Sequence, residues 1–88
     1  MSYNSQVLGS VNNTSGENKE VTVPGMTLIL GGAAVGTYVG LKIGGPIGAA
    51  VGAMVGAFIG ALAAGYIKNF KVIIHPDGVV EVEYETRF

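Results

Sequence analysis

Few side chains in this sequence could carry out chemistry, and they form no recognisable catalytic or metal-binding pattern. The chain has a single imidazole, His75, which lies beside a proline in a predicted turn. A metal site would need further ligands at a defined spacing, and the chain has no cysteine to supply them. Three carboxylates alternate along one predicted strand face: Glu81, Glu83 and Glu85. They could hold a cation weakly, but a solvated face that discourages pairing between strand edges explains them better.

Other reactive or ligand-binding patterns are also missing. The sequence offers no nucleophile paired with a base in a recognisable motif. The glycine-rich run lacks the Gly-Lys-Ser/Thr ending of a phosphate-binding loop and never gives GxGxxG. The net charge is −1, and the five basic residues are scattered, unlike the basic patch of a nucleic-acid-binding protein. We therefore expect no catalysis, no cofactor, no nucleic-acid partner and no small-molecule substrate.

The most regular feature of the chain is a run of tetrads from residue 32 to residue 63. The tetrads read GAAV, GTYV, GLKI, GGPI, GAAV, GAMV, GAFI and GALA. Because residues four apart are neighbours on one face of a helix, the glycines would form a smooth groove. Another helix backbone can approach closely along such a groove, especially inside a membrane. The expected helix-packing residues are Gly32, Gly36, Gly40, Gly44, Gly48, Gly52, Gly56 and Gly60.

The tetrads belong to a longer apolar block, residues 26–67, with one interruption at Gly45 and Pro46. Proline disrupts a helix interior but is harmless in the first turn of a new helix. The block therefore predicts a hairpin of two helices, about 26–43 and 47–67. Each would be roughly 27–32 Å long, which matches a hydrocarbon core about 30 Å thick.

The other side chains of the block indicate what this hairpin would contact. One side of the second helix is bulky, and we expect it to face lipid or neighbouring subunits: Val51, Met54, Val55, Phe58, Ile59 and Leu62. Lys42 is the single charged residue of the block and precedes the interruption. Its long side chain could reach the membrane interface from there, or alternatively line a pore.

The segments on either side of the block are β-prone. Residues 1–25 form a polar arm in which 6–11 and 19–23 suggest a loose hairpin, although disorder fits the composition almost equally well. Residues 68–88 predict a β-hairpin with a turn at His-Pro-Asp-Gly. One face of its second strand is apolar, so it needs cover from the N-terminal arm, a neighbouring subunit or a membrane surface.

The tetrads of residues 32–63 resemble the glycine-zipper membrane hairpins of bacteria, which occur in envelope proteins, pore-forming toxins and bacteriocin-like peptides. This resemblance implies a mainly α membrane protein: a glycine-zipper transmembrane helical hairpin flanked by short β-strands or β-hairpin arms. It covers about a third of the chain. It is specific for a mode of helix packing and not for one function.

Three functions agree with these features. The first is a self-assembling structural or pore-forming membrane subunit, whose partners are copies of itself and the lipid bilayer. Lys68 and Lys71 after the second helix would then place both termini in the cytoplasm. The second is a secreted or phage-borne membrane-active peptide, carried in a virion in the latter case. The third is a non-membrane filament or sheath subunit, in which the helices form a dry core with the β arms outside.

Overall fold

Segments from the two ends of the chain form a single β-sheet in the computed structural model, which describes residues 3–13, 16–61 and 67–86. Its strands are β1 (Tyr3–Ser10), β2 (Lys19–Val23), β3 (Ile67–Ile74) and β4 (Val79–Thr86). The strand order is β1-β4-β3-β2, and every neighbouring pair is antiparallel. The C-terminal hairpin β3–β4 is thus the centre of the sheet, and the two N-terminal strands extend it on opposite sides.

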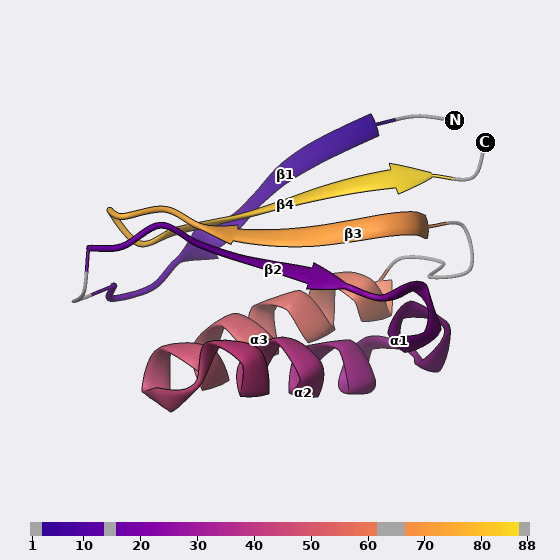
Figure 1. The fold of residues 1–88 in the computed structure, drawn as a ribbon, viewed down its shortest axis with the longest axis horizontal. Helices are drawn as coiled ribbons and strands as arrows, with labels where there is room; N and C mark the ends of the chain where they lie inside the picture. The colour runs from indigo at the N-terminus through magenta and orange to yellow at the C-terminus, as the bar shows by residue number, and fades with distance from the viewer. Residues whose placement is uncertain (1–2, 14–15, 62–66, 87–88) are drawn as a thin grey trace.

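Three helices form a second layer against one face of this sheet (Figure 1). They are α1 (Gly25–Leu30), α2 (Gly32–Ile43) and α3 (Gly45–Ala61). Gly31 ends α1 with φ +100°, and Gly44 ends α2 with φ +77°. Both conformations favour glycine, because a Cβ is strained there. Pro46 lies in the first turn of α3, where its missing N–H would have no partner within the helix.

The prediction of a mainly α membrane protein with a transmembrane hairpin is wrong, because the chain folds as a two-layer α/β domain. The glycine breaks divide the apolar block into helices of 6, 12 and 17 residues. Among the residues that the structure describes, no helix is long and apolar enough to cross a bilayer. The expected cytoplasmic side for both termini depended on such spans and is withdrawn. The last part of the second predicted helix, 62–66, lies outside the described residues.

The core lies between the two layers. The sheet contributes Val23, Phe70, Val72, Ile74, Val80 and Val82, and the helices contribute Leu28, Val35, Val39, Val51, Val55 and Ile59. The apolar face of β4 is therefore covered by helices of the same chain, and not by the N-terminal arm, a neighbouring subunit or a membrane surface; the N-terminal arm joins the sheet edges instead. Val51, Val55 and Ile59, which we expected to face lipid or other subunits, are buried in this core.

The turn between β3 and β4 depends on Gly78, which has φ +94°. The amide of Gly78 donates to the carbonyl oxygen of His75 over 2.9 Å, and the amide of Val79 donates to Oδ1 of Asp77 over 3.1 Å. The amide of Val11 donates to the carbonyl oxygen of Gly78 over 2.8 Å. This turn consequently fixes the chain that leaves β1 as well as the hairpin itself.

Replacing Gly78 with alanine should lower the free energy of unfolding more than replacing Gly16 with alanine. Both residues have positive φ, +94° and +67°, so each substitution costs roughly 1–2 kcal/mol in backbone strain. Only at Gly78 would the added Cβ also collide with the carbonyl oxygen of Val11, whereas nothing lies within 4 Å at Gly16. Urea denaturation of the two variants measures the difference, and equal losses would contradict the close approach of Val11.

Candidate functional site

Each of the four positions of the tetrad points in its own direction from α2 and α3. The first position faces the other helix of the pair, as the close approach between their glycines shows. The fourth position faces the sheet: Val35, Val39, Val51 and Val55 have no exposed surface. The second position faces away from the sheet, because each residue is rotated by about 100° from the one before it. All of its members are exposed: Ala33, Thr37, Leu41, Gly45, Ala49, Ala53, Ala57 and Ala61.

The first position forms a backbone contact between α2 and α3, which we call the glycine seam. It joins Gly32, Gly36 and Gly40 of α2 to Gly56, Gly52 and Gly48 of α3, in that order. A Cβ built on Gly52 would lie 2.5 Å from the carbonyl oxygen of Gly36, and one on Gly48 would lie 2.6 Å from that of Gly40. Only glycine allows this approach, which brings Cα–H groups of one helix to carbonyl oxygens of the other.

The structure thus places seven of the eight expected packing glycines against one another within one chain: Gly32, Gly36 and Gly40 on one helix, and Gly48, Gly52, Gly56 and Gly60 on the other. Gly60 contributes only its backbone, with N and Cα 3.0 and 3.2 Å from the position of a Cβ on Gly32, while a Cβ on Gly60 itself would point away from α2 into open space. The eighth, Gly44, lies in the connection between α2 and α3. Gly45, expected at the interruption, has φ +70° and begins α3.

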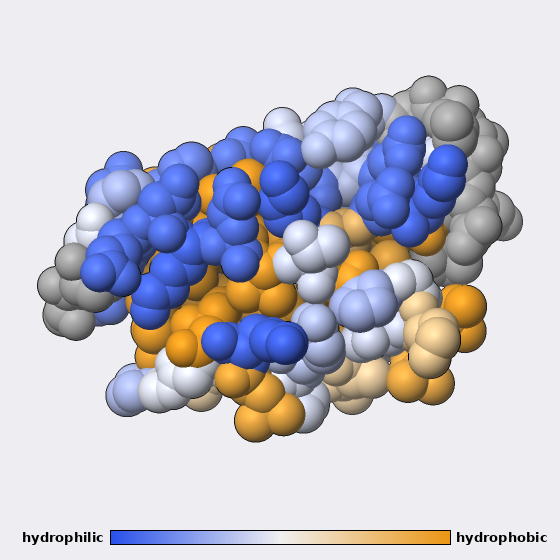
Figure 2. Space-filling view, in the orientation of Figure 1, coloured by the Kyte–Doolittle hydropathy of each residue, from blue (hydrophilic) through white to orange (hydrophobic). Residues whose placement is uncertain are grey.

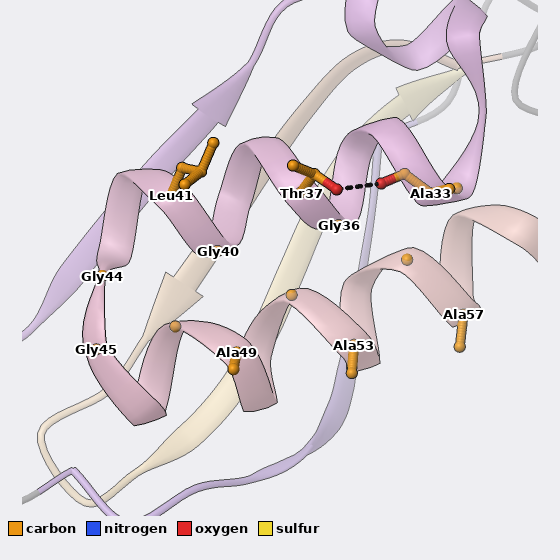
Figure 3. A pocket seen from close by; sticks show the side chains of 14 residues that line it. Ala33, Gly36, Thr37, Gly40, Leu41, Gly44, Gly45, Ala49, Ala53 and Ala57 are labelled. Carbon is orange, nitrogen blue, oxygen red and sulfur yellow. Dashed lines mark hydrogen bonds between the residues drawn. The ribbon is translucent and has the colours of Figure 1, made fainter.

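A shallow groove runs along the side of α2 and α3 that faces away from the sheet (Figure 3). The seam glycines form its floor, and second-position residues form its walls; we call this surface the outward face. Its walls are Ala33, Thr37, Leu41, Ala49, Ala53 and Ala57. The hydroxyl of Thr37 donates a hydrogen bond to the carbonyl oxygen of Ala33 over 2.9 Å. The Thr37 hydroxyl hydrogen is therefore already bonded within α2. Among the residues that the structure describes, no charged side chain lines the groove.

Lys42 lies beside the outward face and not on it. It is exposed in the last turn of α2, where a cation interacts favourably with the helix dipole. Its Nζ is 5.5 Å from the centre of the Tyr38 ring, one helical turn away. A pore-lining role for Lys42 required membrane-spanning helices, which are not found among the described residues.

The face of the sheet opposite the helices is polar and acidic. In Figure 2 hydrophilic residues gather over the strands, and hydrophobic residues lie below them towards the helices. Each glutamate of β4 meets a different neighbour: Glu81 Oε1 is 3.0 Å from His75 Nε2, Glu83 Oε2 accepts from the Tyr3 hydroxyl over 2.8 Å, and Glu85 Oε1 accepts from Asn69 Nδ2 over 2.7 Å. The hydrogen bond to Glu83, together with the negative charges of Glu83 and Glu85, raises the pKa of Tyr3.

These contacts distribute the carboxylates among separate partners and do not converge on one point. Within the described part of the chain, no three histidine, aspartate or glutamate side chains are placed to hold a metal ion. The arrangement is that of a solvated strand face with cross-strand polar pairs.

Two surfaces were missed by the sequence analysis. The second tetrad position was not recognised as one continuous exposed face, although its small uncharged residues recur every four positions. The start of β1 was also missed, because Tyr3, Asn4 and Ser5 show no apolar alternation.

Comparisons of the chain with protein-family models, with curated proteins and with solved structures found no match. The functional site therefore has to be inferred from the surfaces of the chain itself.

Proposed function

We propose that this protein is a non-catalytic structural subunit that assembles with copies of itself through the outward face. One observation carries this proposal: an entire side of the helical layer is exposed, and no charged side chain of residues 3–13, 16–61 and 67–86 lies in its groove. The exposed side of a surface helix is normally polar and charged, and extended apolar surfaces mark contact sites.

The shape of the outward face suits a second helical layer. Alanines and glycines leave a shallow groove, so the side chains and backbone of an opposing helix pair can approach closely. With α3 about 25 Å long and the helix pair about 20 Å wide, this face offers roughly 500 Å² to each partner. That area is slightly below the lower end of the range for specific protein interfaces, which is about 600 Å² per partner.

Helix α1, packed beside the start of α2, adds to the exposed apolar surface of this layer. Met26, Ile29 and Leu30 are each more than two-thirds exposed. Face-to-face pairing would place the helices of two copies in a dry centre with the acidic sheets outside. This is the arrangement of the filament or sheath subunit among the functions that the sequence allows.

A second copy fits the outward face better than an anionic membrane surface. Peripheral helices that bind such membranes carry many lysines or arginines on their polar side. Residues 25–61 contain one cation, Lys42, and the chain has a net charge of −1. Electrostatic attraction to anionic lipid is therefore small.

The oligomeric state of the purified protein tests the proposal. The wild-type chain should associate, and Ala53→Glu should raise the dissociation constant of the contact through the outward face at least about tenfold, since burying an unpaired carboxylate costs more than about 1.4 kcal/mol. Ala50→Glu is the matched control, because Ala50 is an exposed alanine of the same helix that does not line the groove. Analytical ultracentrifugation measures the association, and circular dichroism verifies that both variants fold.

Two results would overturn the proposal. One is a wild-type chain that stays monomeric up to roughly millimolar concentration. The other is equal association of the Ala53→Glu variant and the wild-type chain. Binding to phosphatidylcholine vesicles that is lost with Ala53→Glu, or leakage of dye from them, would assign the outward face to a membrane surface instead.

A further inference from the structure

The two edges of the sheet differ in how they are protected against pairing with other strands. β2 has five residues, includes Lys19 and Glu20, and is followed by Pro24. Short length, charge and proline are the usual means by which an edge avoids further pairing. β1 has eight residues, none of them charged and none proline. It pairs with β4 on one side, and among the described strands no other pairs with its second side.

β1 also carries exposed hydrophobic side chains. Tyr3 is 68% exposed and Val7 is 58% exposed, and no other large hydrophobic side chain on the described strands is similarly exposed. Both project from the acidic face of the sheet, because Tyr3 lies opposite Glu85 and Val7 opposite Glu81 on β4. They are four residues apart, with Ser5 midway between them. The pairing with β4 is regular from Tyr3 to Val7 and becomes irregular only between Val7 and Gly9.

We propose that β1 pairs antiparallel with β1 of a second copy, about a two-fold axis at Ser5. In this register Tyr3 lies opposite the partner's Val7, and Val7 lies opposite the partner's Tyr3. Pairs of an aromatic and a β-branched residue across antiparallel strands are stabilising. On the other face of the sheet Asn4 lies opposite the partner's Gln6. The exposed side chains of β1 are thus complementary to themselves, and the two sheets join into one of eight strands.

The second copy can approach this edge without displacing the helices. In Figure 1 the first half of β1 lies further from the helical layer than the other strands, and the outward face lies on the opposite side of that layer. Where copies also associate through the outward face, as in the proposed function, alternating use of two different two-fold contacts builds an open filament. Pairing of β1 by itself gives a closed dimer, so this proposal does not depend on the outward face.

The first test uses Ser5→Lys with Ser10→Lys as its matched control. At the two-fold axis two lysines would lie directly opposite each other, which is unfavourable. Within one copy the same lysine is adjacent to Glu83, the residue opposite Ser5, so the fold should be retained. Ser10 lies in the same strand beyond the irregular pairing, outside the paired segment 3–7.

Both substitutions are made in the Ala53→Glu variant, in which contact through the outward face is disrupted. Sedimentation should show a dimer for Ala53→Glu and for Ala53→Glu with Ser10→Lys. Adding Ser5→Lys instead should raise the dissociation constant at least about tenfold. An Ala53→Glu variant that is already monomeric overturns the pairing of β1 and leaves the proposed function standing. If Ala53→Glu leaves the assembly of the wild-type chain unchanged but Ser5→Lys abolishes it, the proposed function is overturned and the pairing of β1 is supported.

A second test measures the pairing directly. The chain has no cysteine, so a single Ser5→Cys substitution can form a disulfide only between two copies. Residues directly opposite in antiparallel strands have Cα atoms about 4.5–5.5 Å apart, which is within the range of a disulfide. Oxidation should link Ser5→Cys copies at least about ten times faster than Ser10→Cys copies. Equal rates would overturn the proposed register.

Discussion

Replacing Gly52 with alanine should lower the free energy of unfolding by about 1–3 kcal/mol. This loss is expected although alanine is better than glycine in a helix by about 1 kcal/mol. The added Cβ would lie 2.5 Å from the carbonyl oxygen of Gly36 and 3.4 Å from Cα of Gly40. These are backbone atoms, so α2 and α3 have to move apart. Because the adjacent Val51 is fully buried against the sheet, that movement disturbs the core as well as the seam.

Gly60 provides the matched control for this prediction. It lies in the same helix, and no atom is within 4 Å of the position that its Cβ would occupy. Gly60→Ala should therefore raise the free energy of unfolding, by up to about 1 kcal/mol. Urea denaturation of the two variants should give changes of opposite sign. Stabilisation by both substitutions would show that the glycine seam is not closed in solution.

The tetrad repeat specifies the contacts of these helices better than it specifies their surroundings. Glycine at every fourth position predicts a close helix contact whatever lies beneath the helices. Val51 and Val55, one position before a glycine, must face something apolar. A sheet face and lipid tails meet this need equally well, so hydropathy alone could not distinguish between them. The placement of Val51 and Val55 against lipid or neighbouring subunits was wrong, because both are buried against the sheet.

The positions where the helices end were indicated more clearly by the sequence. The sequence has glycine pairs at 31–32 and 44–45, and the first glycine of each pair takes a positive φ and ends a helix. The break at 31–32 divides the first predicted span into helices of 6 and 12 residues, each too short to cross a bilayer. Only the second break was predicted, from its proline, because two neighbouring glycines do not by themselves show that a helix ends there.

The start of β1 could not be predicted for a different reason. Tyr3, Asn4 and Ser5 have no alternation of apolar residues that would indicate a strand. They are extended because β4 reaches to Thr86 and its backbone pairs with the N-terminal segment. Strand formation there depends on the partner strand more than on local propensity. The exposure of Tyr3 and Val7, on which the pairing of two copies depends, follows only from this tertiary contact.

Replacing Phe70 with alanine should lower the free energy of unfolding by about 3–5 kcal/mol. Phe70 lies in the central strand β3 and is 1% exposed. Its ring centre is 6.2 Å from that of Phe58 in α3, and Phe58 in turn is 5.7 Å from Tyr84 in β4. The three rings join the helical layer to the two central strands, so the loss of Phe70 leaves a cavity at the contact between the layers. Met26→Ala is the control, because this side chain is 79% exposed and should contribute less than about 0.5 kcal/mol.

The effect of Phe70→Ala also distinguishes the two-layer domain from a helical hairpin with independent β arms. A domain of this size has a total stability of about 5–15 kcal/mol, so a loss of 3–5 kcal/mol should shift its whole unfolding transition strongly. In the two-layer fold the helical and strand signals in circular dichroism should be lost together, at a lower urea concentration than in the wild-type chain. Independent arms would lose the strand signal alone while the helices persisted, because Phe70 would then have no contact with α3. Loss of both signals at one midpoint requires that the glycine-rich helices be held by the sheet.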